Sequence, residues 1–114
     1  MTIPLQISFH GVDRTDTIED YVRRRADKLA SYGRITTCQV AIEAPHRHKN
    51  HGRHYRVRVD LAIPGSEIVV DRSPDEGRSH EDLYASIDLA FETALRRLRG
   101  EMDRRRPARE RSEP

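Results

Sequence analysis

The residues best suited to chemistry in this chain are arginines, lysines and histidines, and they fall in blocks. Between Pro45 and Arg58 there are five Lys or Arg and four His without an acid, and between Arg96 and Arg111 there are eight Arg against three acids. Guanidinium groups bind phosphate through paired hydrogen bonds. The formal net charge is only +2, so it is the segregation of charge that predicts a polyanionic partner.

Four histidines within the first block have the pattern H-x-H-x2-H-x2-H, and they are His46, His48, His51 and His54. Imidazoles gathered in this way can bind zinc or nickel. The spacing is not that of a zinc finger or a metalloprotease, and the loop has no Cys or carboxylate to complete a site. We therefore expect no physiological metal and interpret the segment as a basic loop that is solvated or contacts RNA backbone.

The nucleophilic and acidic residues do not form a pattern that is typical of an enzyme active site. The serines lack a Gly-x-Ser-x-Gly setting, and there is no phosphate-binding loop. The adjacent acids Glu81 and Asp82 are explained by a helix N-terminus, which favours negative charge. We expect a protein without catalytic residues, cofactor or small-molecule substrate.

Two amphipathic helices are predicted to carry most of the cations. Residues 79–106 place apolar side chains three and four apart, with Ser79 and Asp82 as a capping box and Pro107 as the stop. Residues 17–32 do the same, with Thr17 and Asp20 as the capping box and Gly33 as C-cap. The predicted apolar stripes are Ile18, Val22, Ala26 and Leu29 in the first helix, and Leu83, Ile87, Ala90, Phe91, Ala94, Leu98 and Met102 in the second.

Each stripe is flanked by cations. In the first helix, Arg24, Arg25 and Lys28 lie with Tyr21 on one flank; in the second, Arg97 and Arg104 share a flank and Arg96 lies further round. If the helices pack side by side, these basic ridges either converge between them or diverge to opposite edges. The sequence leaves both arrangements open.

Alternating apolar residues predict four strands, at residues 5–10, 36–44, 55–63 and 67–71. The order is β-α-β-β-β-α, with the last three strands a meander. We predict an α+β fold, a four-stranded sheet with both helices packed on one face and the other face solvated. Residues 1–106 form this single domain, and residues 107–114 are expected to be a disordered tail. With one cysteine, Cys38, and no membrane-length apolar run or signal peptide, we expect a cytoplasmic protein without membrane contact.

Two segments carry a resemblance to a known family. TIEDYVRRRADKL and, above all, HEDLYASIDLAFETALRRL resemble the ribosome hibernation-promoting factor and ribosome-associated inhibitor family over about residues 5–105. The resemblance implies a domain that binds the small ribosomal subunit, and so the whole ribosome, near the decoding centre. There it blocks the mRNA and tRNA sites and inhibits translation in stress or stationary phase. In length this chain resembles the short members of the family, which act on single ribosomes or pair ribosomes with the help of a separate dimerising factor.

The resemblance also implies which residues meet the 16S rRNA. Arg25, Lys28 and Arg96 match basic family positions, whereas Thr93 and Gly100 stand where members often carry Lys. Arg97, Arg99 and Arg104 can substitute for these, and the basic loop can reach a further phosphate. The predicted rRNA-binding residues are therefore Arg24, Arg25, Lys28, Arg96, Arg97, Arg104, Arg47, Lys49 and Arg53.

Two alternatives from another class of function stay open. In one, the basic face docks an acidic protein, and in the other the His loop makes a metal-responsive binder. Binding to an acidic protein but not to RNA would favour the first. A melting temperature that rises at micromolar metal would favour the second.

Overall fold

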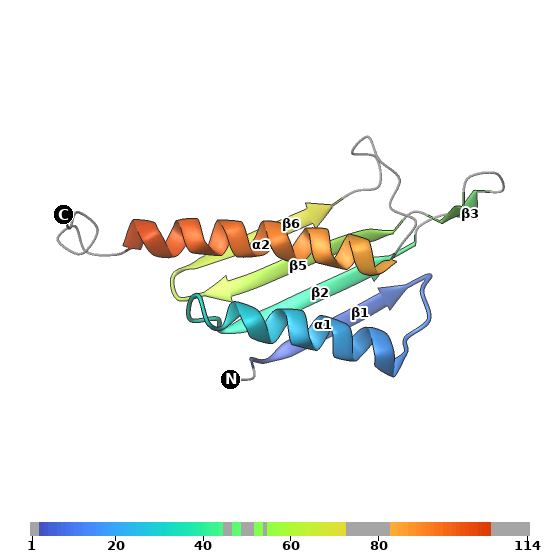
Figure 1. Ribbon diagram of the computed structural model, residues 1–114, viewed down its shortest axis with the longest axis horizontal. Helices are drawn as coiled ribbons and strands as arrows, with labels where there is room; N and C mark the ends of the chain where they lie inside the picture. Colours follow the sequence, from blue (N-terminus) through green and yellow to red (C-terminus); the bar gives the residue numbers. More distant parts are fainter. Residues whose placement is uncertain (1–2, 45–46, 49–51, 54, 73–82, 106–114) are drawn as a thin grey trace.

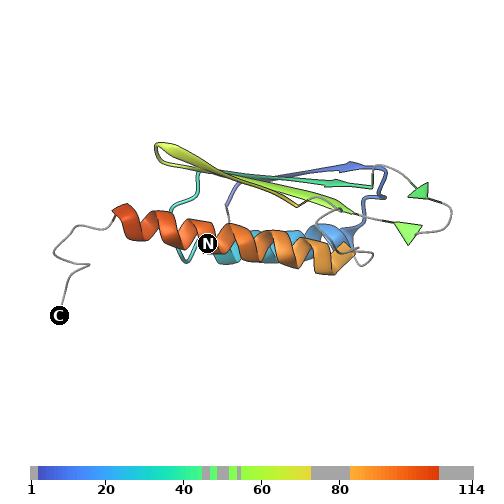
Figure 2. The same cartoon turned by 90° about the horizontal axis from the view of Figure 1, so that it is seen from above.

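The computed structural model describes residues 3–44, 47–48, 52–53, 55–72 and 83–105. They form a four-stranded sheet with two helices on one face and a separate two-stranded hairpin (Figures 1 and 2). In chain order the elements are β1 (Leu5–His10), α1 (Asp16–Leu29), β2 (Thr37–Glu43), β3 (Arg47–His48), β4 (Gly52–Arg53), β5 (Arg56–Ile63), β6 (Ser66–Arg72) and α2 (Leu83–Arg105). The predicted α+β class and its β-α-β-β-β-α order are confirmed, with β3 and β4 added inside the basic loop.

The sheet has the strand order β1-β2-β5-β6. β1 pairs with β2 in parallel, and β2, β5 and β6 form the predicted antiparallel meander. Parallel neighbours need a crossover connection, and α1 supplies it. Figure 1 shows that α1 and α2 lie side by side and run in the same direction. Successive turns of one helix therefore face successive turns of the other.

The core lies between the sheet and the two helices. The predicted stripes are buried in both helices, except that Leu83 and Met102 are only half-buried. From the sheet, alternate residues of β2 and β5 such as Val40, Ile42 and Leu61 fill the same layer. The apolar residues of β1 are half-buried because β1 is an edge strand. Burial of one stripe per helix on one sheet face therefore sets where the remaining helix residues point.

The ends of α1 differ from the prediction. Its N-cap is Thr15, whose Oγ1 accepts a hydrogen bond from the Ile18 amide at 3.2 Å, so the capping box at Thr17 and Asp20 was wrong. The helix ends at Leu29 with Ala30 as C-cap, so Gly33 is not the cap. A Cβ at Gly33 would lie 3.0 Å from the Met102 side chain. This glycine is therefore needed for the close approach of the α1–β2 turn to α2.

Several predictions concern residues outside the described part. The capping box at Ser79 and Asp82, the end of the second helix at Arg106 and the tail at 107–114 all lie there. Among the described residues, no helix is long and apolar enough to cross a membrane. Cys38 is buried in β2, and burial raises the pKa of its thiol to about 12. It is therefore a neutral packing residue at ordinary pH.

The turn after β1 depends on Gly11, which has a φ of +77°. A Cβ there would lie 2.7 Å from the Ala44 carbonyl oxygen, beside the hydrogen bond from the Ala44 amide to the His10 carbonyl. Gly65 has a nearly identical φ of +78°, but a Cβ there would meet nothing within 4 Å. Both glycines therefore have the backbone strain that a side chain would meet at positive φ, but only Gly11 has the steric clash in addition.

We expect Gly65→Ala to lower the free energy of unfolding by about 1 kcal/mol, the cost of a left-handed alanine. Gly11→Ala should cost about 2–4 kcal/mol, because overpacking against backbone adds to that strain. Urea denaturation of both variants, with unchanged m-values, measures the difference. Equal losses for the two would contradict the close approach at Ala44.

Candidate nucleic-acid interface

A groove between α1 and α2 has an apolar floor and cations from α1, and it adjoins a hollow on α2 that has cations of its own. Its first part, of about 40 Å³, is lined by Arg25, Lys28, Leu29, Phe91, Glu92 and Leu95. A second hollow of about 300 Å³ continues along α2 over Glu92, Leu95, Arg96 and Arg99. We call these two hollows together the basic groove. The cations of α1 therefore face the hollow between the helices, whereas Arg96 and Arg99 line the adjoining hollow on α2.

Near the start of α2, the groove is closed by a polar cluster that joins the helices. Asp88 of α2 accepts hydrogen bonds from Tyr21 and Arg25 of α1, the first at 2.5 Å from the tyrosine hydroxyl. The Tyr21 ring also packs edge-on against Tyr84, with 4.8 Å between ring centroids. The hydrogen bond to Asp88 raises the pKa of Tyr21, and contact with Tyr21 and then Asp88 raises that of Arg25. Arg25 is therefore charged and held in place.

Further along the groove, the turn after α1 meets α2. The Arg99 guanidinium lies 5.6 Å from the centroid of the Tyr32 ring, and Tyr32 is 40% exposed. Arg96 and Arg99 are both exposed and line the second hollow. These residues give the groove cations that water reaches and an aromatic surface beside them. Such a combination can bind phosphate and cover a base or sugar.

The outer flanks of the two helices use their arginines differently. On α1, Arg23 donates to the Ile3 carbonyl at 2.6 Å, and on α2, Arg97 donates to the Val69 carbonyl at 2.8 Å. Arg104 pairs with Glu101, which also accepts from Arg105 at 3.0 Å, and these arginines lower the pKa of Glu101. Arg97 and Arg104 therefore lie on the flank toward β6 and not in the basic groove.

The other predicted contacts are not among the residues that line this groove. Arg24 is exposed and lies on the same side of α1 as Lys28, further from the buried stripe. Arg47 and Arg53 are paired neighbours in the β3–β4 hairpin, while Lys49 lies outside the described residues, as do His46, His51 and His54. Thr93, where a lysine was expected, is buried and donates to the Leu89 carbonyl at 3.0 Å. Position 93 therefore does not line the basic groove, and the absence of a lysine there removes no cation from it.

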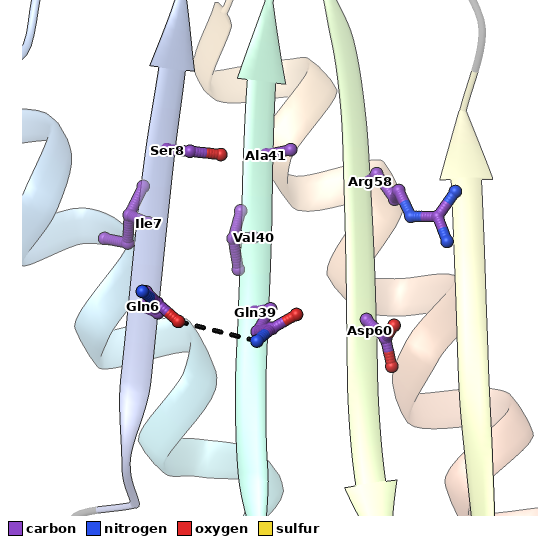
Figure 3. Close-up of a pocket in the computed structure, with 8 residues that line it drawn as sticks. All are labelled: Gln6, Ile7, Ser8, Gln39, Val40, Ala41, Arg58 and Asp60. Atoms are coloured by element: carbon purple, nitrogen blue, oxygen red, sulfur yellow. Dashed lines mark hydrogen bonds between the residues drawn. The ribbon is translucent and has the colours of Figure 1, made fainter.

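The opposite face of the sheet has a hollow of about 340 Å³ near its centre (Figure 3). Gln39 donates to Gln6 there at 3.4 Å, and Arg58 and Asp60 project from the next strand. At the β5–β6 pair, Arg56 binds both carboxylate oxygens of Asp71, at 2.9 and 2.8 Å. That contact lowers the pKa of Asp71.

Charge on this open face is balanced within the sheet. Arg58 lies 3.7 Å from the same Asp71, and Glu43 is 3.9 Å from Arg56. A hydrogen bond with Asp60 raises the pKa of Glu67, as expected for two neighbouring carboxyl groups. Among the described residues, this face therefore has no surplus of cations to attract a polyanion. Of the two faces, the helical one has the electrostatics of a nucleic-acid interface.

Within the described residues, no group of three His, Cys, Asp or Glu is placed to hold a metal ion. Sequence reasoning considered Arg99 only as a substitute and did not identify Asp88 or Tyr32 as part of the interface. Helical periodicity places Asp88, Leu95 and Arg99 on one flank of α2. That α1 lies along this flank is a property of the fold, which is why the pattern alone missed them.

Comparison with known proteins gives a family and several relatives. The family model described as Sigma 54 modulation protein / S30EA ribosomal protein matches residues 5–106. A ribosome hibernation promoting factor of Azotobacter vinelandii is 30% identical over 95 residues, which cover 82% of this chain and 78% of that protein. A ribosome hibernation promotion factor of Deinococcus radiodurans is 32% identical over 95 residues, covering 82% of this chain but only 46% of that protein.

Solved structures share the fold. The N-terminal domain of Thermus thermophilus Protein Y superposes with a TM-score of 0.66 at 22% identity, over 89% of this chain and 99% of that one. A ribosomal subunit interface protein from Coxiella burnetii gives a TM-score of 0.65 at 16% identity, over 86% and 96% of the two chains. The arrangement of two helices on one sheet face is thus shared at low sequence identity.

Proposed function

Because the chain belongs to the family of the sigma 54 modulation protein and S30EA ribosomal protein, we propose that it is a ribosome hibernation factor. It binds the small ribosomal subunit near the decoding centre through the basic groove and blocks the mRNA and tRNA sites in stress or stationary phase. The observation that supports this most directly is the basic groove, on a chain whose relatives are named ribosome hibernation promoting factors. The family is one of non-enzymatic binding proteins, in agreement with the predicted lack of catalytic residues.

Binding in this proposal is electrostatic and shape-dependent. Arg25 and Lys28 line the first hollow and Arg96 and Arg99 line the second, so an RNA backbone that follows the basic groove meets cations of both helices in turn. Folded rRNA offers phosphates at such spacing, and the fixed sheet keeps the two helices at a constant separation. The protein inhibits by occupying space that mRNA and tRNA need, and no bond is made or broken.

The two flanks of α2 provide a matched test of where RNA binds. Arg96 and Arg99 line the groove, and Arg97 and Arg104 lie on the other flank of the same helix. We expect Arg96→Gln with Arg99→Gln to weaken binding to small subunits about tenfold. The slope of log affinity against log salt, about −4 to −5 for five or six contacts, should become shallower by about 2.

The control is Arg97→Gln with Arg104→Gln, which removes the same charge from the same helix. If RNA contacts the groove directly, this control should lose less affinity for small subunits, and its slope of log affinity against log salt should be nearly unchanged. If the two double variants weaken binding equally, the contribution is one of total charge and the groove is not the site. A wild-type slope near zero would contradict the RNA-binding proposal as a whole.

The basic loop offers a further, independent contact. We expect Arg47, Lys49 and Arg53 to reach an additional rRNA phosphate, because the β3–β4 hairpin projects beyond the sheet (Figure 1). Replacing all three with Ala should weaken subunit binding about three- to tenfold and leave the melting temperature unchanged. Sedimentation with small subunits at two salt concentrations measures the effect. Unchanged affinity would exclude the loop from the interface.

Occlusion of the decoding region predicts competition with its normal occupants. The purified protein should sediment with ribosomes at low salt and be released when mRNA and tRNA fill their sites. Release by mRNA and tRNA would support the proposed position. Cosedimentation that is indifferent to them would place the protein elsewhere on the ribosome, and failure to sediment at low salt would contradict the proposal.

A further inference from the structure

The carboxylate of Asp88 lies beside Arg25 at the edge of the basic groove. It accepts hydrogen bonds from two residues of α1 through the same oxygen, Oδ1, one from the Tyr21 hydroxyl and one from the Arg25 guanidinium. Both charged side chains are 32% exposed. At that exposure an ion pair adds less than about 1 kcal/mol to the free energy of unfolding. Stability is therefore a weak explanation for an acid at this position.

Several contacts together hold the Arg25 side chain in one place. Asp88 binds one end of its guanidinium, and the same group lies 5.6 Å from the centroid of the Tyr21 ring. Tyr21 is in turn fixed by its own bond to Asp88 and by the edge-on contact with Tyr84. A guanidinium has five N–H donors, so the bond to Asp88 leaves others for a ligand. Arg25 lines the basic groove in this held conformation.

We infer that Asp88 is a positioning residue for RNA binding, which holds Arg25 ready to contact a phosphate in the basic groove. This inference rests on the proposed function. An unrestrained arginine loses the freedom of several rotatable bonds when it binds phosphate, and that loss costs about 0.5–1.5 kcal/mol per side chain. When Asp88 and Tyr21 already restrain Arg25 in the free protein, binding no longer bears this cost.

Positioning and simple electrostatics predict opposite signs for one substitution. Asp88→Asn removes a negative charge beside the groove while keeping the shape of the side chain. Coulomb attraction alone predicts tighter binding to RNA. Positioning predicts weaker binding, by about 2- to 10-fold, because Arg25 loses its restraint. The direction of the change therefore separates the two explanations.

Glu92 provides the matched control. It lies one turn after Asp88 on α2 and lines both hollows of the groove, and no ion pair is found for it among the described residues. Glu92→Gln removes the same charge without releasing a cation. We expect this variant to bind small subunits about twofold more tightly at low salt, which gives the size of the charge effect alone.

The experiment measures affinity for small ribosomal subunits and melting temperature for the wild type and for Asp88→Asn, Glu92→Gln, Arg25→Ala and the double variant of Asp88 and Arg25. We expect Asp88→Asn to weaken binding in the wild-type background. In the Arg25→Ala background the same substitution should change the affinity little or strengthen it. The melting temperature of Asp88→Asn should stay close to that of the wild type. Asp88→Glu, which can still reach Arg25, should recover part of the loss.

Two results would overturn the inference. One is tighter binding by Asp88→Asn to the extent seen for Glu92→Gln. The other is an equal loss with and without Arg25, which would mean that Asp88 acts through the fold. Either result would leave the proposed function intact, provided that the wild type binds with a salt-dependent affinity and Arg25→Ala weakens it. A wild type that does not bind small subunits would instead contradict the proposed function.

Discussion

The structure depends on burying one apolar stripe from each helix on the same face of a four-stranded sheet. Val22, Ile87 and Leu98 are fully buried at this contact, together with alternate residues of β2 and β5. Once the stripe is buried, the remaining positions of a helix have no freedom to rotate, because about 100° separates successive residues. Each helix therefore has an inner flank toward the other helix and an outer flank toward a sheet edge (Figure 1).

This division separates arginines that look equivalent in the sequence. Arg23 and Arg97 face the sheet edges and bind the carbonyls of Ile3 and Val69. Arg25 and Arg96, only a residue or two away, face the basic groove. Edge carbonyls are polar groups that need partners, so the outer cations are engaged within the fold. Of the inner cations, Arg96 is exposed and lines the basic groove, where a phosphate backbone can reach it.

The two faces of the molecule also differ in how their charges are balanced. On the open sheet face, Arg56 and Arg58 share Asp71, and cross-strand pairing places them beside it. Such pairs suit a solvated antiparallel face and leave little net field. On the helical face the cations of α1 and α2 slightly outnumber the acids, with nine Lys or Arg against eight Asp or Glu, and Asp88 is engaged with Tyr21 and Arg25. Attraction for a polyanion therefore arises on one side, although the whole chain has a formal charge of only +2.

The sequence by itself determined the elements, because periodicity is a local property of the chain. Alternation at residues 55–63 and the three- and four-residue spacing from Leu83 to Leu98 predicted β5 and α2, and the fold class followed from their order. The ends of α1 were predicted less well. The N-cap is Thr15, two residues before the predicted Thr17, and Gly33 is needed for the close approach to Met102 and is not the C-cap.

Only the tertiary structure decided which charged and aromatic side chains meet. The parallel pairing of β1 with β2 sets α1 beside α2, and their common direction brings Arg25 to Asp88 and Tyr32 to Arg99. These pairs are more than sixty residues apart in sequence, so no local pattern could relate them. The chain encodes the flank on which each charge lies, whereas packing of the helices on the sheet decides which flanks face one another.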